Sequence, residues 1–598
     1  MIYETKEELH KVGPVTVPSL HVTRLSDVDL SNCGLLSQST ISDYLVILRS
    51  HEDLALIRTI ICTSQARSRT LIEMVDGGIG LVLAIPGLVD LSIKYVRAIV
   101  HKIGIYRKAG DFLADQLQEH DIQTSQLEVC LTFVKKASTS FPAELEILIR
   151  KALYRLTKAL EIALASLEDN IDKKETIRKW RYTMYGRSEL KRDLERVAKD
   201  QLLFYRAVQW VILSGGAAVE AHLTEEQQRG SEPLERVKRL KNAIDLRLKG
   251  NDDDIPKMLL DDSDLSSAAY HALPHSEIGV LSLKSDTSDV PTALVEYRSY
   301  VEQEAKKVRD IALVLYHTSE SMAILSCKGF KARTKVNPAR FELIFPLPPG
   351  SARPRTLRDV LLGDESRSGV PFSLTWRLEL GIRLATAIMY VHTSGLVHKN
   401  IRPENLILLG DRITPKGDER PVKGKTAGKL YLIGFEFARK EDEASTRIGD
   451  DTWWKNLYRH PQRQGVHPEI DFNMLHDIYS LGVVLLEIAL WRSLVLEETD
   501  DNTGEKRYVV NRDAVKISDK KTGRLKDPEE IKKIFVDKAA DFIPQVFGDK
   551  YRDVVEMCLN CLDKGGLKDI ENAKDQDGIT VGMAYIEKIL TTLDEIAI

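Results

Sequence analysis

This chain contains no apolar run of the roughly 20 residues that a membrane-spanning helix requires. Its longest uncharged apolar segment, Gly77–Val89, is about 13 residues long, which is too short to cross a bilayer as a helix. Pro86 and Gly87 would kink or interrupt a helix there. The first residues, MIYETKEELHK, are charged and lack an apolar core, so we expect no secretory signal.

The chain also lacks an excess of basic residues and a dense set of cysteines. It has 85 Lys and Arg against 89 Asp and Glu, a net charge of −4, so we expect no nucleic-acid partner. Six cysteines in 598 residues argue against a disulfide framework and favour a reducing, cytoplasmic location. Cys558 and Cys561 form a C-x-x-C within a helical pattern, and we interpret them as helix-core residues rather than metal ligands.

Helical periodicity dominates the first half of the chain. Phe112–Lys136, Pro142–Glu168 and Ser188–Gly215 have apolar residues at helical spacing, with Ser188 as the predicted N-cap and Gly215 as the stop. Long helices joined by short loops predict an all-α bundle, which we place at residues 76–220. Residues 1–75 carry no motif and are treated as an extension of unknown role. The polar stretch 221–290, with its acidic run, is predicted to be a linker.

A second region is organised around Val391–Leu409, VHTSGLVHKNIRPENLILL. The pattern predicts a helix from Leu374 to Val391, a polar loop, and a short strand at Leu406–Leu409. The loop carries His398, Asn400, Arg402 and Asn405, and it resembles the protein kinase catalytic loop H-R-D-L-x-x-x-N. Asn400 stands where a kinase has its catalytic Asp.

Three further segments follow in kinase order. Leu430–Arg439 resembles the D-F-G segment, with Gly434 in place of the metal-binding Asp. Tyr458–Gln462 resembles the end of the activation segment, and Asp477–Glu487 resembles the central helix of the C-lobe. We therefore predict a multidomain protein: an all-α bundle followed by an α+β, bilobal kinase-like domain at residues 291–598, divided near residue 347 into N-lobe and C-lobe.

The two replacements predict an inactive enzyme. In a kinase the loop Asp accepts the substrate proton and the D-F-G Asp holds the metal ion that neutralises the phosphates. Asn cannot accept that proton near neutral pH, and Gly offers no ligand. The resemblance therefore predicts a pseudokinase with no intact catalytic or metal site. The alternative is an active or weakly active kinase that uses another carboxylate, Glu404 or Glu436.

The N-lobe gives little support for nucleotide binding. Ala293–Tyr297 is predicted to be the strand that carries the ATP-pairing Lys, with Arg298 as the candidate basic residue, and Glu302–Leu315 the helix after it. Met322–Lys328 and Arg340–Pro346 are predicted to be strands. No G-x-G-x-x-G precedes Ala293 to cover phosphates. We expect no cofactor; ATP with Mg²⁺ stays open because Asn405 is retained.

The opener Gly77–Tyr95, followed by a helical pattern and a degenerate kinase domain, resembles the HeLo and HeLo-like (prion-inhibition and propagation) domains of fungal proteins. The resemblance implies a signalling, cell-death or incompatibility effector whose bundle oligomerises or engages membrane. Its expected partners are proteins, a second copy of the chain, and a membrane surface contacted through Gly77–Tyr95. Its expected location is the cytoplasm, with peripheral membrane association on activation. The alternative is that this segment is only a buried core helix.

Overall fold

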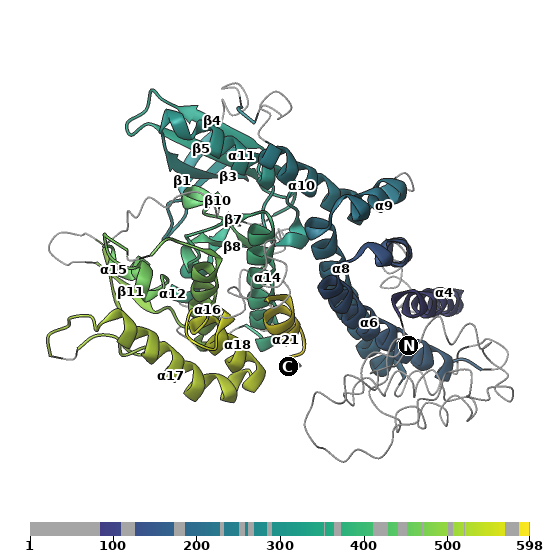
Figure 1. The fold of residues 1–598 in the computed structure, drawn as a ribbon. Helices are drawn as coiled ribbons and strands as arrows, with labels where there is room; N and C mark the ends of the chain where they lie inside the picture. The colour runs from purple at the N-terminus through teal and green to yellow at the C-terminus, as the bar shows by residue number, and fades with distance from the viewer. Residues whose placement is uncertain are drawn as a thin grey trace, which may run out of the picture. The chain divides into compact units, whose positions relative to one another are not determined.

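A computed structural model of the chain describes residues 84–108, 126–172, 177, 186–227, 232–249, 258–260, 268–283, 290–351, 353–363, 372–410, 428–440, 451–468, 470–499, 506–519, 521–567 and 585–596. The chain divides into two compact units, residues 1–235 and 236–598. The first is helical, and the second combines helices with a sheet (Figure 1). This arrangement confirms the predicted fold class, a helical domain followed by a kinase-like fold.

The first unit is built from long helices with one buried face each. They are α4 (Ile85–Lys108), a helix over 126–137, α6 (Ala143–Asp169), α8 (Arg187–Ser214) and α9 (Ala217–Gln227). Along α6, Leu145, Ile149, Leu156 and Ala163 recur at helical spacing and are buried. The apolar faces of the helices therefore form the core of this unit, as the periodicity predicted.

Buried polar contacts determine the axial alignment of α4 and α6. The hydroxyls of Ser92 on α4 and Thr157 on α6 are 2.7 Å apart and buried. The Tyr106 hydroxyl donates to the Leu167 carbonyl at 3.3 Å, near the far end of the same two helices. Because a buried polar group without a partner costs about 1–3 kcal/mol, such contacts favour one alignment of α4 on α6.

Of the apolar opener Gly77–Tyr95, residues 77–83 lie outside the described residues, and the rest begins α4. Pro86 does not kink this helix, because it lies in the first turn, where a backbone N–H is not needed. Leu88, Val89 and Val96 are buried in the bundle. Among the residues that the structure describes, no helix is long and apolar enough to cross a membrane.

The N-cap of helix α8 is not the residue that the sequence predicted. Its N-cap is Gly186, so Ser188 lies inside the first turn and is not the cap. Gly215 ends the helix, as predicted, in an extended conformation. A Cβ at Gly215 would lie 2.6 Å from the Val211 carbonyl oxygen, so close approach of the chain to α8 requires glycine there.

The predicted linker 221–290 contains ordered elements. Besides the end of α9, the described residues of this range form α10 (Glu232–Lys249), β1 (Ala268–Ala272) and β2 (Gly279–Leu283). Strand β2 pairs antiparallel with β3 (Val290–Ser299). The assignment of the whole range to a linker was wrong because two five-residue strands in a polar context give little periodic signal, and their stability comes from pairing.

The N-lobe is a five-stranded antiparallel sheet of order β1-β2-β3-β5-β4, with β4 at Gly329–Arg333 and β5 at Arg340–Pro346. Strand β5 occupies the predicted residues. The strand predicted at Met322–Lys328 instead forms later, as β4. Helix α11 (Ala305–Tyr316) lies between β3 and β4 in the chain and packs on the sheet (Figure 1).

The C-lobe is built around α16 (Met474–Leu490), whose side chains are almost all buried. Helix α14 (Leu374–Thr393) and helix α18 (Asp549–Leu559) pack against it. A Cβ at Gly482 would lie 2.8 Å from the Cys558 Cβ, so α16 and α18 approach closely only with glycine at this position. The segment Asp477–Glu487 is thus the central helix that its pattern predicted.

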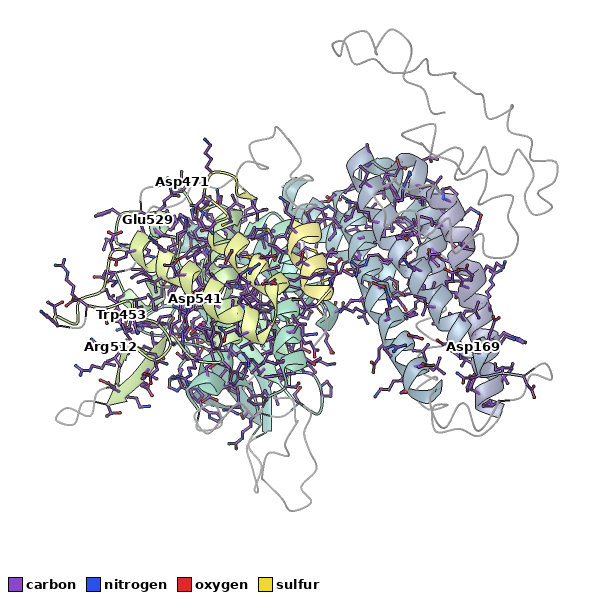
Figure 2. The ribbon with its side chains drawn as sticks, turned by 90° about the horizontal axis from the view of Figure 1, so that it is seen from below. Asp169, Trp453, Asp471, Arg512, Glu529 and Asp541 are labelled. Atoms are coloured by element: carbon purple, nitrogen blue, oxygen red, sulfur yellow. The ribbon has the colours of Figure 1, made fainter. Side chains whose placement is uncertain are left out.

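Further C-lobe elements surround this core. Among them are α12 (Leu357–Leu362), α15 (Trp453–Asn456), the hairpin β11 (Val495–Thr499) and β12 (Lys506–Val510), α17 (Pro528–Val546) and α21 (Thr591–Asp594). Helix α17 buries Ile531, Phe535 and Ile543 and exposes Glu529 and Asp541 (Figure 2). Cys558 and Cys561 are free and buried, and the Cys561 thiol donates to the Leu475 carbonyl at 3.2 Å.

Candidate active-site cleft

One buried carboxylate, that of Asp477, fixes the backbone conformation of the loop after α14. Helix α14 ends at Thr393, and Gly395, with φ 64°, turns the chain into β7 (Leu396–Val397). Asp477 on α16 accepts the backbone N–H of His398 at 2.7 Å and that of Lys399 at 2.9 Å. Lys399 has φ 68°, a conformation that non-glycine residues rarely adopt. The two hydrogen bonds to Asp477 stabilise this strained turn.

Asp477 stays ionised although it is fully buried. Burial alone would raise its pKa, but the hydrogen bond and charge of His392 and the backbone N–H of His398 together lower it. The His392 Nε2 atom lies 3.1 Å from the Asp477 carboxylate. A carboxylate that accepts several N–H groups in the interior is stabilised in its charged form. Asp477 is therefore a structural anchor for the loop.

The side chain of His398, a predicted site residue, is buried in the protein core. Burial lowers its pKa to about 4, so its imidazole is neutral at physiological pH. Its Nδ1 accepts the Asn400 backbone N–H at 3.3 Å, and its ring meets the Phe435 ring edge-on, with centroids 4.7 Å apart. The ring contact joins the loop to the segment that resembles D-F-G.

Asn400 and Asn405, the two predicted amide residues, are brought together by the loop. Asn405 ends a turn of 3-10 helix (Pro403–Asn405) before β8 (Leu406–Leu409). Its side-chain nitrogen donates to the Asn400 carbonyl at 2.8 Å. The Asn400 side-chain nitrogen in turn donates to Glu436 at 2.9 Å. The position of the kinase catalytic Asp is thus occupied by a neutral amide that is hydrogen-bonded to a carboxyl group.

Glu436 is one of the two carboxylates that the alternative prediction named. Burial and the charge of the nearby Glu277 raise its pKa to about 7, against the lowering effects of Arg402, Lys455 and Asn400. A carboxyl group with a pKa near 7 has the proton affinity that general bases use. Glu436 is therefore the only one of the two named carboxylates whose surroundings suit proton transfer.

The other named carboxylate, Glu404, belongs to a buried ion cluster. Arg358 on α12 donates to Glu404 at 2.9 Å and to Glu487 at 3.1 Å, and also donates to the Tyr458 hydroxyl at 2.5 Å. Burial alone would lower the pKa of Arg358, but its neighbours raise it well above the usual range. These contacts tie α12 to the catalytic-loop equivalent, to α16 and to Tyr458, and they leave Glu404 a structural role.

Arg402, the third predicted loop residue, lies at the edge of the same cluster. Its Nε is 3.9 Å from the Glu404 carboxylate. Its guanidinium carbon lies 5.3 Å from the centroid of the Trp454 ring. Arg402 is buried, and through Trp454 it connects the loop with α15.

Gly434 stands in a backbone conformation that admits no side chain. Its φ is 95°, and a Cβ there would lie 2.5 Å from the Asn405 Cγ. Only glycine adopts such a conformation without strain. An aspartate at this position, which the resemblance assigns to the metal-binding residue, would therefore be strained and crowded by Asn405.

The turn at Gly434 presents two backbone N–H groups to a buried carboxyl group, that of Glu296, which the sequence did not single out. Glu296 on β3 accepts the Gly434 N–H at 2.5 Å and the Phe435 N–H at 2.7 Å. Burial raises the pKa of Glu296 to about 8, and the two N–H groups only partly offset it. We call this contact the Glu296 clamp. It joins the N-lobe sheet to the D-F-G-like segment.

The kinase pattern V-A-I-K, which carries the β3 Lys, can be matched to this strand in two registers. A-L-V-E at residues 293–296 puts Glu296 at the position of that Lys, and V-E-Y-R at residues 295–298 puts Arg298 there. Arg298, the sequence-based candidate, lies two residues further along the strand. It donates to the Ala438 carbonyl at 3.0 Å and lies 3.6 Å from Glu304. The role predicted for Arg298 stays a prediction; its guanidinium contacts the D-F-G-like segment and Glu304.

The turn between β1 and β2 lies where a kinase has its glycine-rich loop. Residues 273–278 contain no glycine. The Ser276 hydroxyl donates to the Glu404 carbonyl at 3.1 Å, and Lys455 of α15 donates to Glu277 at 3.1 Å. The turn is thus fastened to the catalytic-loop equivalent and to α15, both in the C-lobe.

These residues do not fit Mg²⁺–ATP. Glu296, the β3 side chain that faces the D-F-G-like segment, supplies no cation to pair with phosphates, and Gly434, which the resemblance places at the metal-binding Asp, has no side chain to offer a metal ion. Within the described ranges, no group of three or more His, Cys, Asp or Glu side chains is placed to hold a metal ion. The Asn405 amide, the one retained ligand type, is engaged with Asn400 and packed against Gly434.

The sheet with α11, the helical lobe centred on α16, and the loop of His398–Asn405 between them define a protein kinase-like region. Over 133 residues the chain is 26% identical to a probable dual specificity protein kinase, madd-3, of Caenorhabditis elegans, covering 22% of this chain and 14% of that protein. Over 123 residues it is 26% identical to a putative serine/threonine-protein kinase, R436, of Acanthamoeba polyphaga mimivirus, covering 21% of this chain and 38% of that protein.

A third relative is a probable serine/threonine-protein kinase, CPE1738, of Clostridium perfringens, 23% identical over 135 residues and matched over 16% of its length. The chain spans well under half the length of each of these curated relatives. No protein-family model matches the chain.

Proposed function

We propose that the kinase-like region is a pseudokinase, a protein-interaction module that transfers no phosphate and takes no nucleotide. The Glu296 clamp is the observation that carries the proposal. In kinases the β3 Lys contributes a positive charge to the phosphates. Glu296 supplies no cation in either protonation state, and its two oxygens are committed to the Gly434 and Phe435 N–H groups.

The clamp and the glycine turn support each other. The Gly434 conformation is what directs two N–H groups at Glu296, and the same conformation excludes an aspartate at that position. A reversal of either replacement alone would leave the other in conflict with it. This mutual dependence favours a stable, specialised arrangement over simple loss of single catalytic residues.

A second candidate function, an active kinase with an unusual base, is favoured by Glu436. Its carboxyl group is 2.9 Å from the Asn400 side chain and has a pKa of about 7. A positioned base contributes about 10²–10⁴-fold to a reaction. This candidate still lacks a phosphate-pairing cation and a metal ligand at Gly434, so we place it second.

A phosphotransfer assay separates the two candidates. The full chain is incubated with radiolabelled ATP, Mg²⁺ or Mn²⁺, and a generic protein substrate, beside the Glu436→Gln variant. Glu498→Gln, on the exposed β11 strand, is the matched control. The pseudokinase proposal expects background incorporation from all three proteins. Incorporation by the wild type and the control that Glu436→Gln abolishes would establish the second candidate instead.

For the helical unit we propose the role of a responding domain in a signalling or cell-death effector, one that oligomerises or engages membrane when the kinase-like region binds its partner. The support is the resemblance of the opener Gly77–Tyr95 to HeLo-type domains and the order of bundle and kinase-like region. The buried face of α4, including Leu88 and Val96, would have to leave the bundle for such a step. The protein would then be cytoplasmic and peripheral to membrane on activation.

Dye release from anionic liposomes by the full chain tests this role. Leu88→Asp and Val96→Asp place charges on the α4 face that would enter the membrane, and Asp90→Asn on the exposed face of α4 is the control. Release by the wild type and Asp90→Asn, with loss in the two charged variants that remain folded by circular dichroism, supports it. Absence of release and of self-association at all concentrations would leave a scaffold in which α4 is only core.

A further inference from the structure

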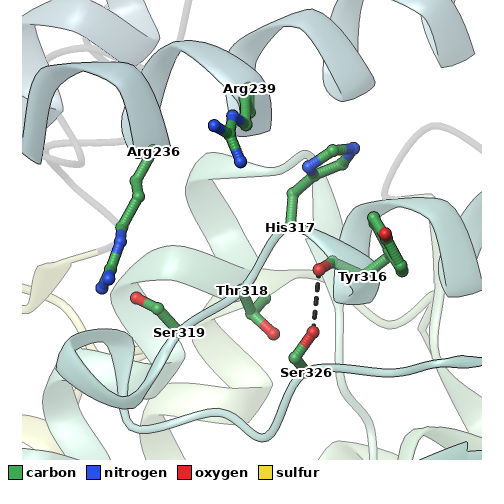
Figure 3. A pocket seen from close by; sticks show the side chains of 7 residues that line it. All are labelled: Arg236, Arg239, Tyr316, His317, Thr318, Ser319 and Ser326. Carbon is green, nitrogen blue, oxygen red and sulfur yellow. Dashed lines mark hydrogen bonds between the residues drawn. The ribbon is translucent and has the colours of Figure 1, made fainter. Parts of the chain in front are cut away.

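A cationic pocket lies outside the cleft, at the end of α11 (Figure 3). It has a volume of about 440 Å³ and is lined by Arg236 and Arg239 of α10 and by residues of the turn after α11, Tyr316, His317, Thr318, Ser319 and Ser326. All seven residues belong to the second compact unit. Small-molecule sites have volumes of roughly 300–1,000 Å³, so the pocket is large enough for a ligand.

The charge of this pocket is of one sign. None of its seven lining residues is acidic, and two are arginines one helical turn apart. Figure 3 shows both arginine side chains reaching from α10 toward the turn 316–319. Burial and then the charge of Arg239 lower the pKa of His317, which records how close the imidazole lies to the guanidinium. The imidazole offers a further N–H at the wall of the pocket.

The carbonyl groups at the C-terminus of α11 have donors other than these two arginines. Cations stabilise a helix C-terminus because its last carbonyls lack partners. Here the Leu315 carbonyl accepts the Thr318 hydroxyl at 2.7 Å and the Cys327 N–H at 3.0 Å. The Tyr316 carbonyl accepts the Ser326 hydroxyl at 2.8 Å. These carbonyl groups already have donors, so they do not require a guanidinium.

We propose that this pocket binds a small-molecule phosphate monoester. Guanidinium groups match the geometry of phosphate oxygens and pair with two of them at once. Two arginines from one helix face would hold the phosphate, with the Ser319 hydroxyl beside Arg236 as a further donor. The Tyr316 ring, 51% exposed, offers an apolar surface to the group that carries the phosphate. The site is separate from the Glu296 clamp and does not rest on the proposed pseudokinase function.

Isothermal titration calorimetry on the full chain tests the proposal, with inorganic phosphate and ribose 5-phosphate as probes and chloride at equal ionic strength as the blank. Arg236→Gln and Arg239→Gln remove one charge each from the exposed side of α10. Arg507→Gln, on the exposed strand β12, is the matched control for net charge. We expect saturable binding to the wild type and to Arg507→Gln, and about tenfold weaker binding in each pocket variant, since a charge-assisted contact is worth about one decade.

Tighter binding of ribose 5-phosphate than of inorganic phosphate assigns the ligand as a phosphate ester. Equal binding of the two probes assigns the site to free phosphate and contradicts the ester. No saturable heat with either probe, or the same affinity in the wild type and both pocket variants, would overturn the site itself. Circular dichroism of the two variants, which change surface residues only, verifies that a loss of binding is not a loss of fold.

Discussion

Glu296 and Phe435, 139 positions apart in the chain, are joined by a 2.7 Å hydrogen bond between the Glu296 carboxyl group and the Phe435 N–H. The bond joins the N-lobe strand β3 to the segment that would bind metal in a kinase. With the bond from the Gly434 N–H, it gives the D-F-G-like segment a contact to the N-lobe sheet that is made within the protein alone.

The first prediction concerns pH and the Glu296 carboxyl group. Its pKa is about 8 in the folded protein, against an ordinary value of 4.5 for an exposed glutamate, so the folded state binds more protons between these values. Stability should therefore fall as pH rises through this window, by up to about 1.4 kcal/mol per pH unit for one group. Urea unfolding of the wild type and Glu296→Gln from pH 5 to pH 8.5 measures it.

Glu296→Gln cannot titrate, so its stability should decline less with pH than that of the wild type. Glu436, with a raised pKa of about 7, contributes in the same direction in both proteins. Identical pH profiles for the wild type and Glu296→Gln would contradict a buried, protonated Glu296.

The second prediction is that aspartate is not tolerated at position 434. Gly434→Asp would place a Cβ 2.5 Å from the Asn405 Cγ at a φ of 95°. Gly465→Ala is the matched control, because Gly465 has φ 80° and no atom near its Cβ position. Backbone strain alone costs about 1–3 kcal/mol.

Gly434→Asp should therefore lose clearly more stability than Gly465→Ala in urea unfolding, and it should gain no phosphotransfer. If Gly434→Asp is as stable as the wild type, the glycine is only a missing ligand and the mutual dependence of turn and clamp is wrong.

The third prediction concerns the pair Asn400 and Glu436. Asn400→Asp would set two carboxyl groups at hydrogen-bonding distance in the cleft. One of them must then hold a proton or both must repel, so stability should drop more at pH 8 than at pH 5. A double-mutant cycle with Glu436→Gln should restore most of the loss at pH 8. Additive effects of the two changes would show that the side chains do not interact.

The fourth prediction tests the buried cluster of Arg358. Arg358→Met should cost about 3–5 kcal/mol, because it leaves Glu404 and Glu487 buried without their cation. Arg355→Gln is the control, since its pair with Asp359 is partly exposed and is worth at most about 1 kcal/mol. Thermal or urea unfolding compares the two. A cost for Arg358→Met no larger than that of Arg355→Gln would contradict the structural role of the cluster.

The elements with strong periodicity were predictable from sequence. Helix α6 and strands β5 and β8 lie within a residue of their predicted ranges, because an amphipathic stripe or a compact apolar run determines each of them locally. Strands β1 and β2 were missed because short strands in a polar context are stabilised by their partners rather than by their own pattern.

The residues of the cleft also differ in how far they could be predicted from the sequence. The loop residues His398, Asn400 and Asn405 are contiguous in sequence, and the structure brings them together. The Glu296 clamp depends on contacts between residues 138 and 139 positions apart in the chain, and no local sequence pattern indicates it. The available signal is an acidic residue, Glu296, within the apolar run of β3, and this signal does not identify the partners of Glu296.

The central claim, that the cleft takes no nucleotide, is tested most directly by titrating Mg²⁺–ATP into the full chain and measuring heat and thermal stability. The Arg236→Gln/Arg239→Gln double variant is titrated in parallel, so that binding in the cationic pocket is not mistaken for binding in the cleft. A ligand that binds the folded state must raise its stability. The account predicts no saturable, metal-dependent binding to the double variant at millimolar ATP. Saturable, metal-dependent binding that persists in the double variant would contradict it.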